Sequence, residues 1–324
     1  MISIIKNLLN KIFGLVNFKL ISHKKELEYK NYLFSTIEAL KEVEKKNYSM
    51  NGLSCIVFSK DRAIQLYALL ESYNKFIQNP IDIIVIYKSS SKDHEKAYVE
   101  LSSLIKHFSF NTDLIKEKKS FRETLIDTLS KVKTKNIFFL TDDDIFINKF
   151  NFDLLLNINS NKKTFSLRHN PRISYSFTAN TNFKPPKFSV YKSVVNFNEF
   201  NWFDSGYEWA DPWSVNGHIY LTAEIMVISR ISNYKFPNSY ESALKFFNFL
   251  MTNRKGLCCN ESIIMNIPMN IVQTEYKNLH GNISIDFLLH NWNKGYKINI
   301  DHLEKFKLNS THVNMNKEIE FKKR

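Results

Sequence analysis

Residues 136–147 read NIFFLTDDDIFI, so three consecutive aspartates follow one apolar run and precede another. The first run predicts a buried strand, and the aspartates are expected where that strand ends. Adjacent carboxylates repel one another and resist desolvation, whereas a divalent cation bound by hard oxygen ligands cancels their charge and links them to a phosphate. We therefore predict a metal and diphosphate site at Asp142, Asp143 and Asp144. The alternative is an acidic turn between two strands.

The chain around this run alternates short apolar stretches with amphipathic segments from residue 53 onward. This pattern is typical of strand–helix units on a parallel sheet. It predicts strands at 54–58, 81–87, 114–115 and 136–140, and helices at 63–76, 94–107 and 121–132. Ligands bind beyond the carboxyl ends of the strands in open sheets of this type. The loops 59–62, 88–91 and 142–144 are therefore expected to converge on one site.

The loop at 59–62 mixes an acceptor with two cations just before a helix, where backbone N–H groups and the helix dipole favour a phosphate. The predicted nucleotide contacts are Ser59, Lys60, Asp61, Arg62, Lys88 and Asp142. Asp61 is expected to hold a base or ribose, or to cap the helix that follows. A glycine-rich dinucleotide or phosphate-loop motif is missing and the chain has only seven glycines, which disfavours dinucleotide-binding and ATPase functions.

The composition indicates one large globular domain, or one domain with an appended subdomain. The chain has 324 residues, of which 44% are hydrophobic and 14% aromatic. Its three cysteines lack metal-ligand spacing and indicate neither a disulfide framework nor a zinc site, so a reducing cytosol fits best. Lysine and arginine exceed aspartate and glutamate by 45 − 32 = 13 charges, which favours phosphorylated or polyanionic partners or an anionic membrane surface.

Both ends of the chain differ from the middle. Residues 1–50 are predicted to form a helical extension, whose first part, 1–21, carries an apolar face opposite a polar one. That face suits peripheral contact with a membrane surface, or packing on its own domain. The segment has too many polar interruptions to span a bilayer or to act as a secretory signal. The lysine-rich residues 306–324 are expected to form a basic, solvated tail.

The residues at 57–62 and the apolar strand that ends in Thr-Asp-Asp-Asp resemble the nucleotide-sugar half of GT-A glycosyltransferases, especially family 2-like bacterial enzymes. Segments 215–220, 236–241 and 266–273 resemble stretches that recur in bacterial glycosyltransferase-like proteins. The resemblance covers approximately residues 53–303. It implies an α/β, GT-A-like single domain with a mixed, mostly parallel central sheet flanked by helices.

Within that domain the resemblance implies a nucleotide-sugar-binding half at 51–150 and an acceptor-binding half at 151–305. It also implies a nucleoside-diphosphate sugar as donor and a Mn²⁺ or Mg²⁺ ion bound through an Asp-x-Asp motif. Two registers of that motif are open: Asp142 and Asp144 form the pair, or Thr141 replaces the first acid and Asp143 carries the metal. Family enzymes usually carry an acidic residue just after the second strand, but the loop 87–91 has none, which leaves the base specificity open.

Glycosyl transfer leaves negative charge on the departing diphosphate, and a divalent metal stabilises it. An inverting enzyme also needs a carboxylate that accepts the proton of the acceptor hydroxyl. Family position implies Glu241, whose alternative role is a first-turn carboxylate favoured by the helix dipole. Asp211 and Glu208 are alternative bases. They belong to the aromatic and acidic segment 202–213, which is expected either to bind an acceptor sugar or to cover a core edge.

The leading prediction is a metal-dependent glycosyltransferase that extends a cell-surface glycan or glycolipid, such as lipopolysaccharide or capsule, from the cytoplasmic side of the membrane. One alternative is a sugar nucleotidyltransferase, although the glycine-rich nucleotide loop usual in those enzymes is missing. The other is a basic nucleic-acid-binding protein. Its lysines are scattered and no binding module is recognisable, so no nucleic-acid partner is expected. The sequence assigns no oligomeric state.

Overall fold

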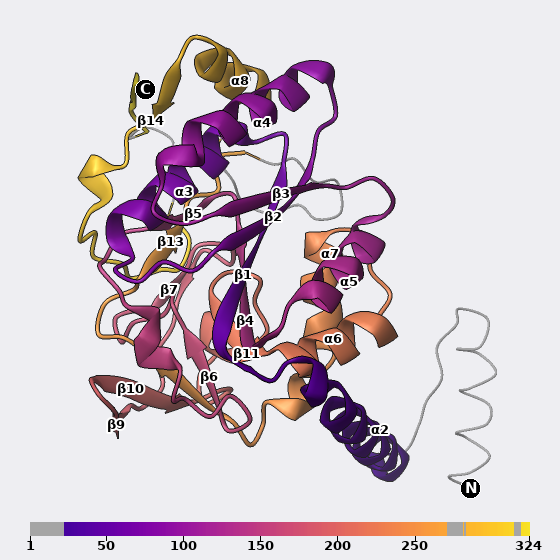
Figure 1. Cartoon of the computed structure of the whole chain (residues 1–324). Coiled ribbons are helices and arrows are strands. Elements are labelled where there is room, and N and C mark those ends of the chain that lie inside the picture. The colour runs from indigo at the N-terminus through magenta and orange to yellow at the C-terminus, as the bar shows by residue number, and fades with distance from the viewer. Residues whose placement is uncertain (1–22, 271–280, 282, 314–318) are drawn as a thin grey trace, which may run out of the picture.

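The computed structural model describes residues 23–270, 281, 283–313 and 319–324 (Figure 1). Nine strands form the main sheet: β1 (Met50–Lys60), β2 (Ile83–Lys88), β3 (Thr112–Lys116), β4 (Thr134–Thr141), β6 (Lys163–Ser166), β9 (Ser189–Lys192), β10 (Asn196–Asn201), β11 (His218–Leu221) and β12 (Lys255–Cys258). Three two-stranded ribbons pair β5 (Asp144–Phe146) with β13 (Ile264–Asn266), β7 (Tyr175–Ser176) with β8 (Thr181–Asn182), and β14 (Tyr296–Ile298) with β15 (Phe321–Lys323).

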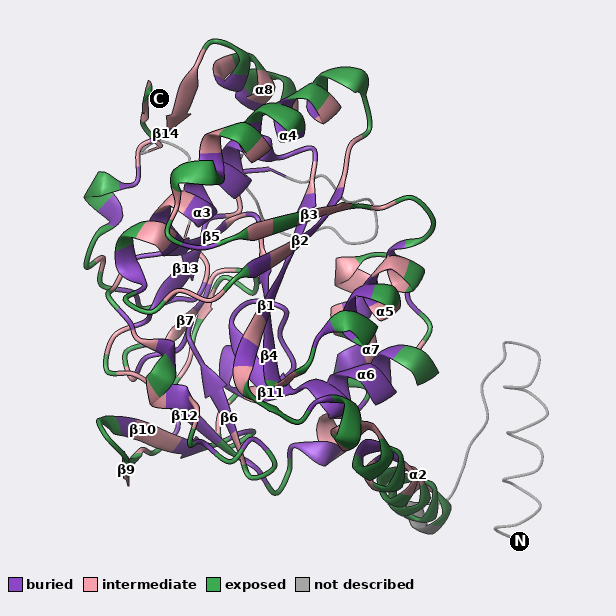
Figure 2. Cartoon of the chain, in the orientation of Figure 1, coloured by how far each residue is buried: buried purple, intermediate pink, exposed green. Residues whose placement is uncertain are grey.

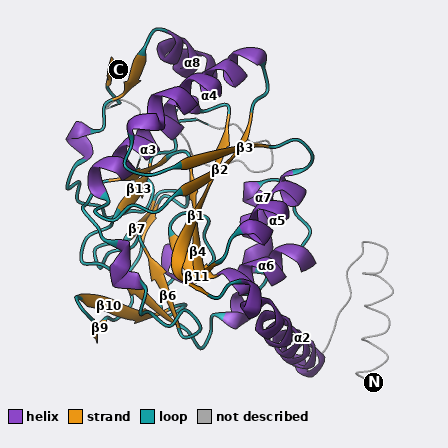
Figure 3. Ribbon diagram, in the orientation of Figure 1, coloured by secondary structure: helices purple, strands orange, loops and turns teal. Residues whose placement is uncertain are grey.

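Helices flank the sheet (Figure 3). The α-helices are α2 (His23–Glu44), α3 (Ala63–Phe76), α4 (Lys92–Leu104), α5 (Phe121–Lys131), α6 (Thr222–Ile231), α7 (Pro237–Lys245) and α8 (Ile285–Asn293). The short 3-10 helices are η1 (Lys45–Asn47), η2 (Ile105–His107), η3 (Phe152–Leu155), η4 (Tyr207–Ala210), η5 (Asn248–Leu250) and η6 (Asp301–Leu303).

The strand order is β3-β2-β1-β4-β11-β6-β12-β10-β9. Pairing is parallel from β3 to β4, and β11 and β10 run opposite to the other 9 − 2 = 7 strands. This mixed, mostly parallel sheet confirms the predicted fold class. The predicted helix at 63–76 is reproduced residue for residue, and the four predicted strands and the two other predicted helices lie within a few residues of their expected positions.

Both faces of the central strands are buried. Successive residues of a strand point to opposite faces of the sheet, so each face packs against its own core. On β1, Cys55 and Val57 belong to the core under α3 and α4, whereas Ile56 and Phe58 belong to the core under α5, α6 and α7. The strands are accordingly continuous apolar runs (Figure 2). Burial on both sides holds the loops at the carboxyl ends of these strands in place.

The predicted helical lead-in is confirmed as α2, whose last turns pack on α6. Ile37 is fully buried there, and buried Lys41 donates to Glu38 at 2.5 Å. The first turns of α2 extend away from the body (Figure 1). None of the described helices has both the length and the apolarity that crossing a membrane requires. The predicted membrane-surface segment 1–21 lies outside the described residues.

The expectation of a solvated carboxyl-terminal tail is wrong for the described part of residues 306–324. Leu308 and Thr311 are buried, and β15 pairs with β14. Arg324 stacks over Trp292, with 4.0 Å between the guanidinium carbon and the ring centroid. Lysine content suggested solvation, but apolar residues between the lysines pack against the core.

Candidate active site

One cavity of about 250 Å³ lies at the carboxyl ends of β1, β2 and β4. The strand order reverses there, since β2 and β4 flank β1 on opposite sides, and such switch points are where open α/β sheets bind ligands. The predicted site residues that line the cavity are Ser59, Lys60, Arg62, Lys88, Asp142, Asp143 and Glu241. The remaining predicted site residues, all of them described, do not line it: Asp61, Asp144 and Asp211.

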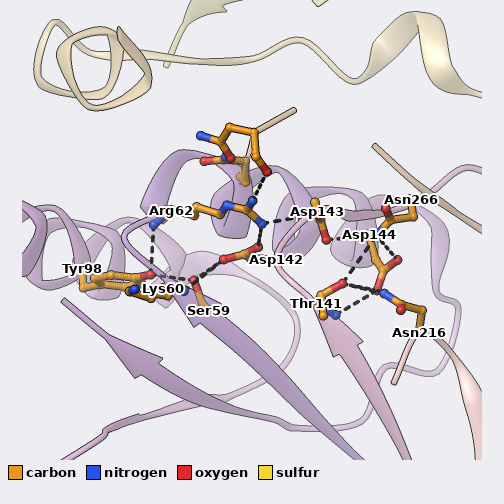
Figure 4. A network of polar contacts seen from close by, with 12 residues as sticks. Ser59, Lys60, Arg62, Tyr98, Thr141, Asp142, Asp143, Asp144, Asn216 and Asn266 are labelled. Carbon is orange, nitrogen blue, oxygen red and sulfur yellow. Dashed lines mark hydrogen bonds and ion pairs between the residues drawn. The ribbon is translucent and has the colours of Figure 1, made fainter. Parts of the chain in front are cut away.

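Asp142 is neutralised from within the protein. Its Oδ1 accepts a hydrogen bond from Nη1 of Arg62 at 2.9 Å, and its Oδ2 accepts from the Ser59 hydroxyl at 2.8 Å and from the backbone N–H of Lys60 at 3.2 Å (Figure 4). Burial raises the pKa of Asp142 to about 6, although the neighbouring Arg62 charge acts in the opposite direction. This carboxylate ties the loop after β1 to the end of β4.

Asp144 is fully buried, and its partners are the nearby Thr141 and two asparagines distant in the chain, Asn216 and Asn266 (Figure 4). Its Oδ2 accepts from the backbone N–H of Thr141 and from the side-chain amide of Asn216, both at 2.8 Å. Its Oδ1 accepts from the amide of Asn266 at 3.0 Å. Burial, followed by the charge of Asp143, raises the pKa of Asp144 to about 7. Asp144 therefore fixes the geometry of the acidic turn and does not face the cavity.

Asp143 is the aspartate with room for a ligand. Its side chain is 13% exposed, Oδ1 accepts from Asn266 at 2.9 Å, and Oδ2 lies 3.3 Å from Nη1 of Arg62. Among the described residues, no three His, Cys, Asp or Glu side chains meet as a metal-binding group, so a site with three aspartate ligands does not form. Mg²⁺ is commonly held by one or two carboxylates plus substrate phosphates. Asp143 suits that kind of site, which favours the second register.

Arg62 and Asp61 diverge at the end of β1. The Arg62 side chain is 9% exposed; Nη2 donates to the Asn270 carbonyl, while its buried Nε has no partner within the described chain. Asp61 has a positive φ of 57° and accepts from the Ser90 backbone at 2.6 Å and the Ser90 hydroxyl at 2.5 Å. The N-cap alternative for Asp61 is wrong, because Arg62 holds that position of α3. Asp61 instead joins the loops after β1 and β2.

Glu241 lines the cavity and is anchored by the loop after η4. The backbone N–H of Val215 donates to its Oε1 at 3.3 Å. The first-turn alternative is wrong, because α7 begins at Pro237 and its first turn contains no acidic residue. Asp211 lies behind Glu241 and forms a 2.9 Å ion pair with Lys245. Burial and the Glu241 charge raise the pKa of Asp211 to about 6.

The aromatic segment 202–213 belongs mostly to the core. Trp202, Trp209 and Trp213 are at most 4% exposed, and Nε1 of Trp209 donates to a backbone carbonyl. These tryptophans therefore cover a core edge, and the prediction that they bind an acceptor sugar is wrong. Glu208, the other alternative base, is also buried and does not line the cavity.

Further polar residues that line the cavity, and to which the sequence assigned no role, are Glu117, Thr178, Asn216, Asn238, Asn266, Asn270 and His312. The asparagines belong to segments 215–220, 236–241 and 266–273, which the resemblance named as a whole. Asparagines carry no charge pattern, and their partners lie as far as 208 residues away in the chain. His312 was hidden in the segment expected to be a tail. Burial and the nearby Arg168 and Lys245 charges lower its pKa to about 3, so its ring is neutral at physiological pH. His312 and Asp143 line the same cavity.

The site combines an acidic turn, cations that are buried or face the cavity, and a carboxylate on a separate helix. On an α/β sheet this combination defines a candidate nucleotide-sugar site of the GT-A-like type. The chain is similar to the bifunctional glycosyltransferase pgtA of Dictyostelium discoideum, with 28% identity over 220 residues. The match covers 60% of this chain but only 28% of that protein. The predicted resemblance to glycosyltransferases is thereby confirmed in sequence. No family model matches the chain.

Solved structures overlap more loosely. An S. aureus TarS fragment shares 15% identity and a TM-score of 0.40 over 65% of this chain and 59% of that one. The same fragment in complex with UDP-GlcNAc gives a TM-score of 0.41 at 15% identity, over 70% of this chain and 60% of that one. The Anaerococcus prevotii 4-diphosphocytidyl-2C-methyl-D-erythritol synthase gives a TM-score of 0.39 at 11% identity, over 76% of this chain and 97% of that one. TM-scores this low assign no function.

Proposed function

We propose that this protein is a glycosyltransferase that moves a sugar from a nucleoside-diphosphate sugar to a glycan or glycolipid acceptor. The observation that carries the proposal is the single cavity that brings Asp143, Arg62 and Glu241 together from β4, the β1 loop and α7. One wall offers groups that suit a diphosphate, and another offers a carboxylate for the acceptor hydroxyl. Sequence similarity to a glycosyltransferase supports the same reaction class.

On the donor side, the cations of this chain act on the diphosphate. Lys60 and Arg62 line the cavity, so they would stabilise charge as it develops on the leaving group. Asp143 would hold a divalent cation, Mn²⁺ or Mg²⁺, with His312 as a neutral neighbour. Such a cation supplies Lewis-acid stabilisation of the leaving diphosphate. Asp142 and Asp144 keep Asp143 in position through the buried contacts described above.

On the acceptor side, Glu241 would accept the proton of the attacking hydroxyl. Its hydrogen bond from the Val215 backbone leaves Oε2 for the acceptor and fixes the direction of the carboxylate. Asp211 would act through Lys245 and Glu241, since it does not line the cavity. A cell-surface acceptor and a site of action at the inner membrane face, with residues 1–21 on the lipid, complete the proposal. Those residues lie outside the described chain.

The test is release of nucleoside diphosphate from a panel of nucleotide sugars, with Mn²⁺ or Mg²⁺ and a membrane-glycan extract. Glu241→Gln is expected to lower turnover roughly 10²- to 10⁴-fold while donor binding persists. Glu199→Gln on β10 removes a matched carboxylate away from the cavity and should retain activity. Pyrophosphate exchange without sugar transfer or hydrolysis would instead identify a nucleotidyltransferase and refute the proposal.

A further inference from the structure

The ion pair between Lys88 and Glu117 lies on the edge-strand side of the cavity, away from Asp143. Lys88 ends β2, and Glu117 directly follows β3. The Lys88 Nζ lies 2.7 Å from Oε1 of Glu117, and both residues line the cavity. The Glu117 side chain is 8% exposed, and within the described chain its Oε2 accepts no hydrogen bond. This oxygen remains available to a ligand.

The strand register sets the distance between this ion pair and the acidic turn. Lys60 pairs with Lys88 and Tyr87 with Lys116, so Lys88 and Glu117 follow side by side on the same sheet face. Neighbouring strands are about 4.8 Å apart, and β3 and β4 are three steps apart, about 14 Å in all. That span suits an extended nucleoside diphosphate. With its phosphates at the β4 turn, its base reaches the Lys88–Glu117 pair.

The cavity wall beside this ion pair is apolar. Phe58 and Ile86 are register partners on β1 and β2, and both line the cavity together with Phe121 at the start of α5. The rings of Phe58 and Phe121 are 5.1 Å apart and nearly perpendicular. Flat aromatic bases pack well against such surfaces. The site thus combines an apolar wall with one charged polar edge, as base recognition requires.

We propose that Lys88 and Glu117 read the edge of a guanine base, which makes the donor a guanosine-diphosphate sugar; this inference rests on the proposed function. The ion pair presents a row of one donor and two acceptors: Nζ of Lys88, then Oε1 and Oε2 of Glu117. The guanine edge presents one acceptor and two donors: O6, N1–H and the N2 amino group. In that order, O6 would accept from Nζ of Lys88, N1–H would donate to Oε1 of Glu117, and the N2 amino group would donate to Oε2.

Other bases match this row less well. Uracil presents O4, N3–H and O2, so its O2 would face Oε2 of Glu117 with two acceptors in contact. Cytosine and adenine have a ring-nitrogen acceptor beside their amino group, where guanine has N1–H. In either orientation of these bases, that nitrogen would face an acceptor oxygen of Glu117. A bidentate contact of this kind typically discriminates roughly 5- to 150-fold against a wrong base.

Calorimetric titration of the full chain with GDP, UDP, CDP and ADP in Mg²⁺ tests the inference. The wild type should bind GDP at least ~10-fold more tightly than the others. Glu117→Gln replaces Oε2 with an amide donor, and the row of donor, acceptor and donor then matches uracil. This variant should lose GDP affinity by ~10-fold or more and bind UDP more tightly than GDP. Asp93→Asn on exposed α4 changes the net charge equally and should leave all four affinities unchanged.

The outcomes separate this inference from the proposed function. Equal or tighter binding of UDP or CDP by the wild type would overturn the guanine assignment and leave the glycosyltransferase proposal standing. Absence of binding to any nucleotide would overturn both. If Glu117→Gln does not fold, as judged by circular dichroism, Lys88→Met decides. It should weaken GDP binding ~10-fold by removing the donor to O6, and unchanged GDP affinity would reject the assignment.

Discussion

Replacing Arg62 should leave the buried carboxylate of Asp142 without its ion-pair partner and so lower the stability of the fold. In Arg62→Met, Asp142 keeps its buried position, with 3% of its side chain exposed, but loses its 2.9 Å ion-pair partner. Breaking one side of a buried pair typically costs about 3–5 kcal/mol, because the remaining charge is left uncompensated. We expect a loss of this size in the free energy of unfolding at pH 8, measured by urea denaturation.

The loss should depend on pH. The pKa of Asp142 already rises from its ordinary 3.8 to about 6 in the folded protein, a shift equivalent to about 3 kcal/mol. A carboxyl group with a raised folded-state pKa favours the folded state below its unfolded value, and that contribution is lost as the pH rises through the folded value. Without Arg62 the folded pKa rises further. At pH 5, below that value of about 6, Asp142 is largely protonated with or without Arg62, so the loss in stability should fall to roughly half its value at pH 8.

A double-mutant cycle completes the test. Arg62→Met combined with Asp142→Asn removes both charges, so most of the lost stability should return, with a coupling of at least about 1.5 kcal/mol. Arg172→Met is the matched control, because its partner Glu261 is 45% exposed and such surface pairs contribute about 0–1 kcal/mol. Additive single effects, or a loss equal at pH 5 and pH 8, would refute neutralisation of Asp142 by Arg62.

Two further predictions concern the cavity. Asn266→Ala removes the amide that holds Asp143, so Mn²⁺-dependent nucleotide binding should weaken ~10- to 100-fold in calorimetric titration. Lys245→Met leaves Asp211, whose pKa is raised to about 6, without its cation beside Glu241. Loss of the cation should raise the pKa of Asp211 further, and the acidic limb of the transfer rate should shift to higher pH, as a pH-rate profile would show.

Matched variants guard against general disruption. Asn260→Ala removes an exposed amide that bonds only to another asparagine, and it should not alter metal-dependent binding. Unchanged binding in Asn266→Ala would show that Asp143 does not need the amide. Lys245→Arg keeps the positive charge and should restore the acidic limb. A limb that stays fixed in Lys245→Met would mean that the ionisation of Asp211 does not affect transfer.

The sequence predicted the fold of residues 51–150 because its signals there are local. Apolar runs of strand length and amphipathic helices recur in order, and both sheet faces are buried, so each predicted element stays close to its place. Residues 151–305 were less predictable. Trp202 and Trp209 resemble sugar platforms in sequence, but whether a ring packs inward depends on which strand lies beneath it. Asn216 and Asn266 acquire their roles only when distant loops meet Asp144.

Three adjacent carboxylates could share this turn only by being held in different ways. Repulsion within a buried acidic triplet is relieved by spreading the charges over separate partners. Asp142 forms an ion pair with Arg62, and Asp144 accepts from asparagine amides. Asp142 and Asp143 both line the cavity, but Asp143 is the more exposed of the two, at 13% against 3%. The two buried carboxylates thus fix the backbone on either side of Asp143. A cation bound at Asp143 would then meet a carboxylate that is already oriented. Arg62 lies beside that carboxylate as a permanent positive charge, available to the diphosphate of the proposed donor.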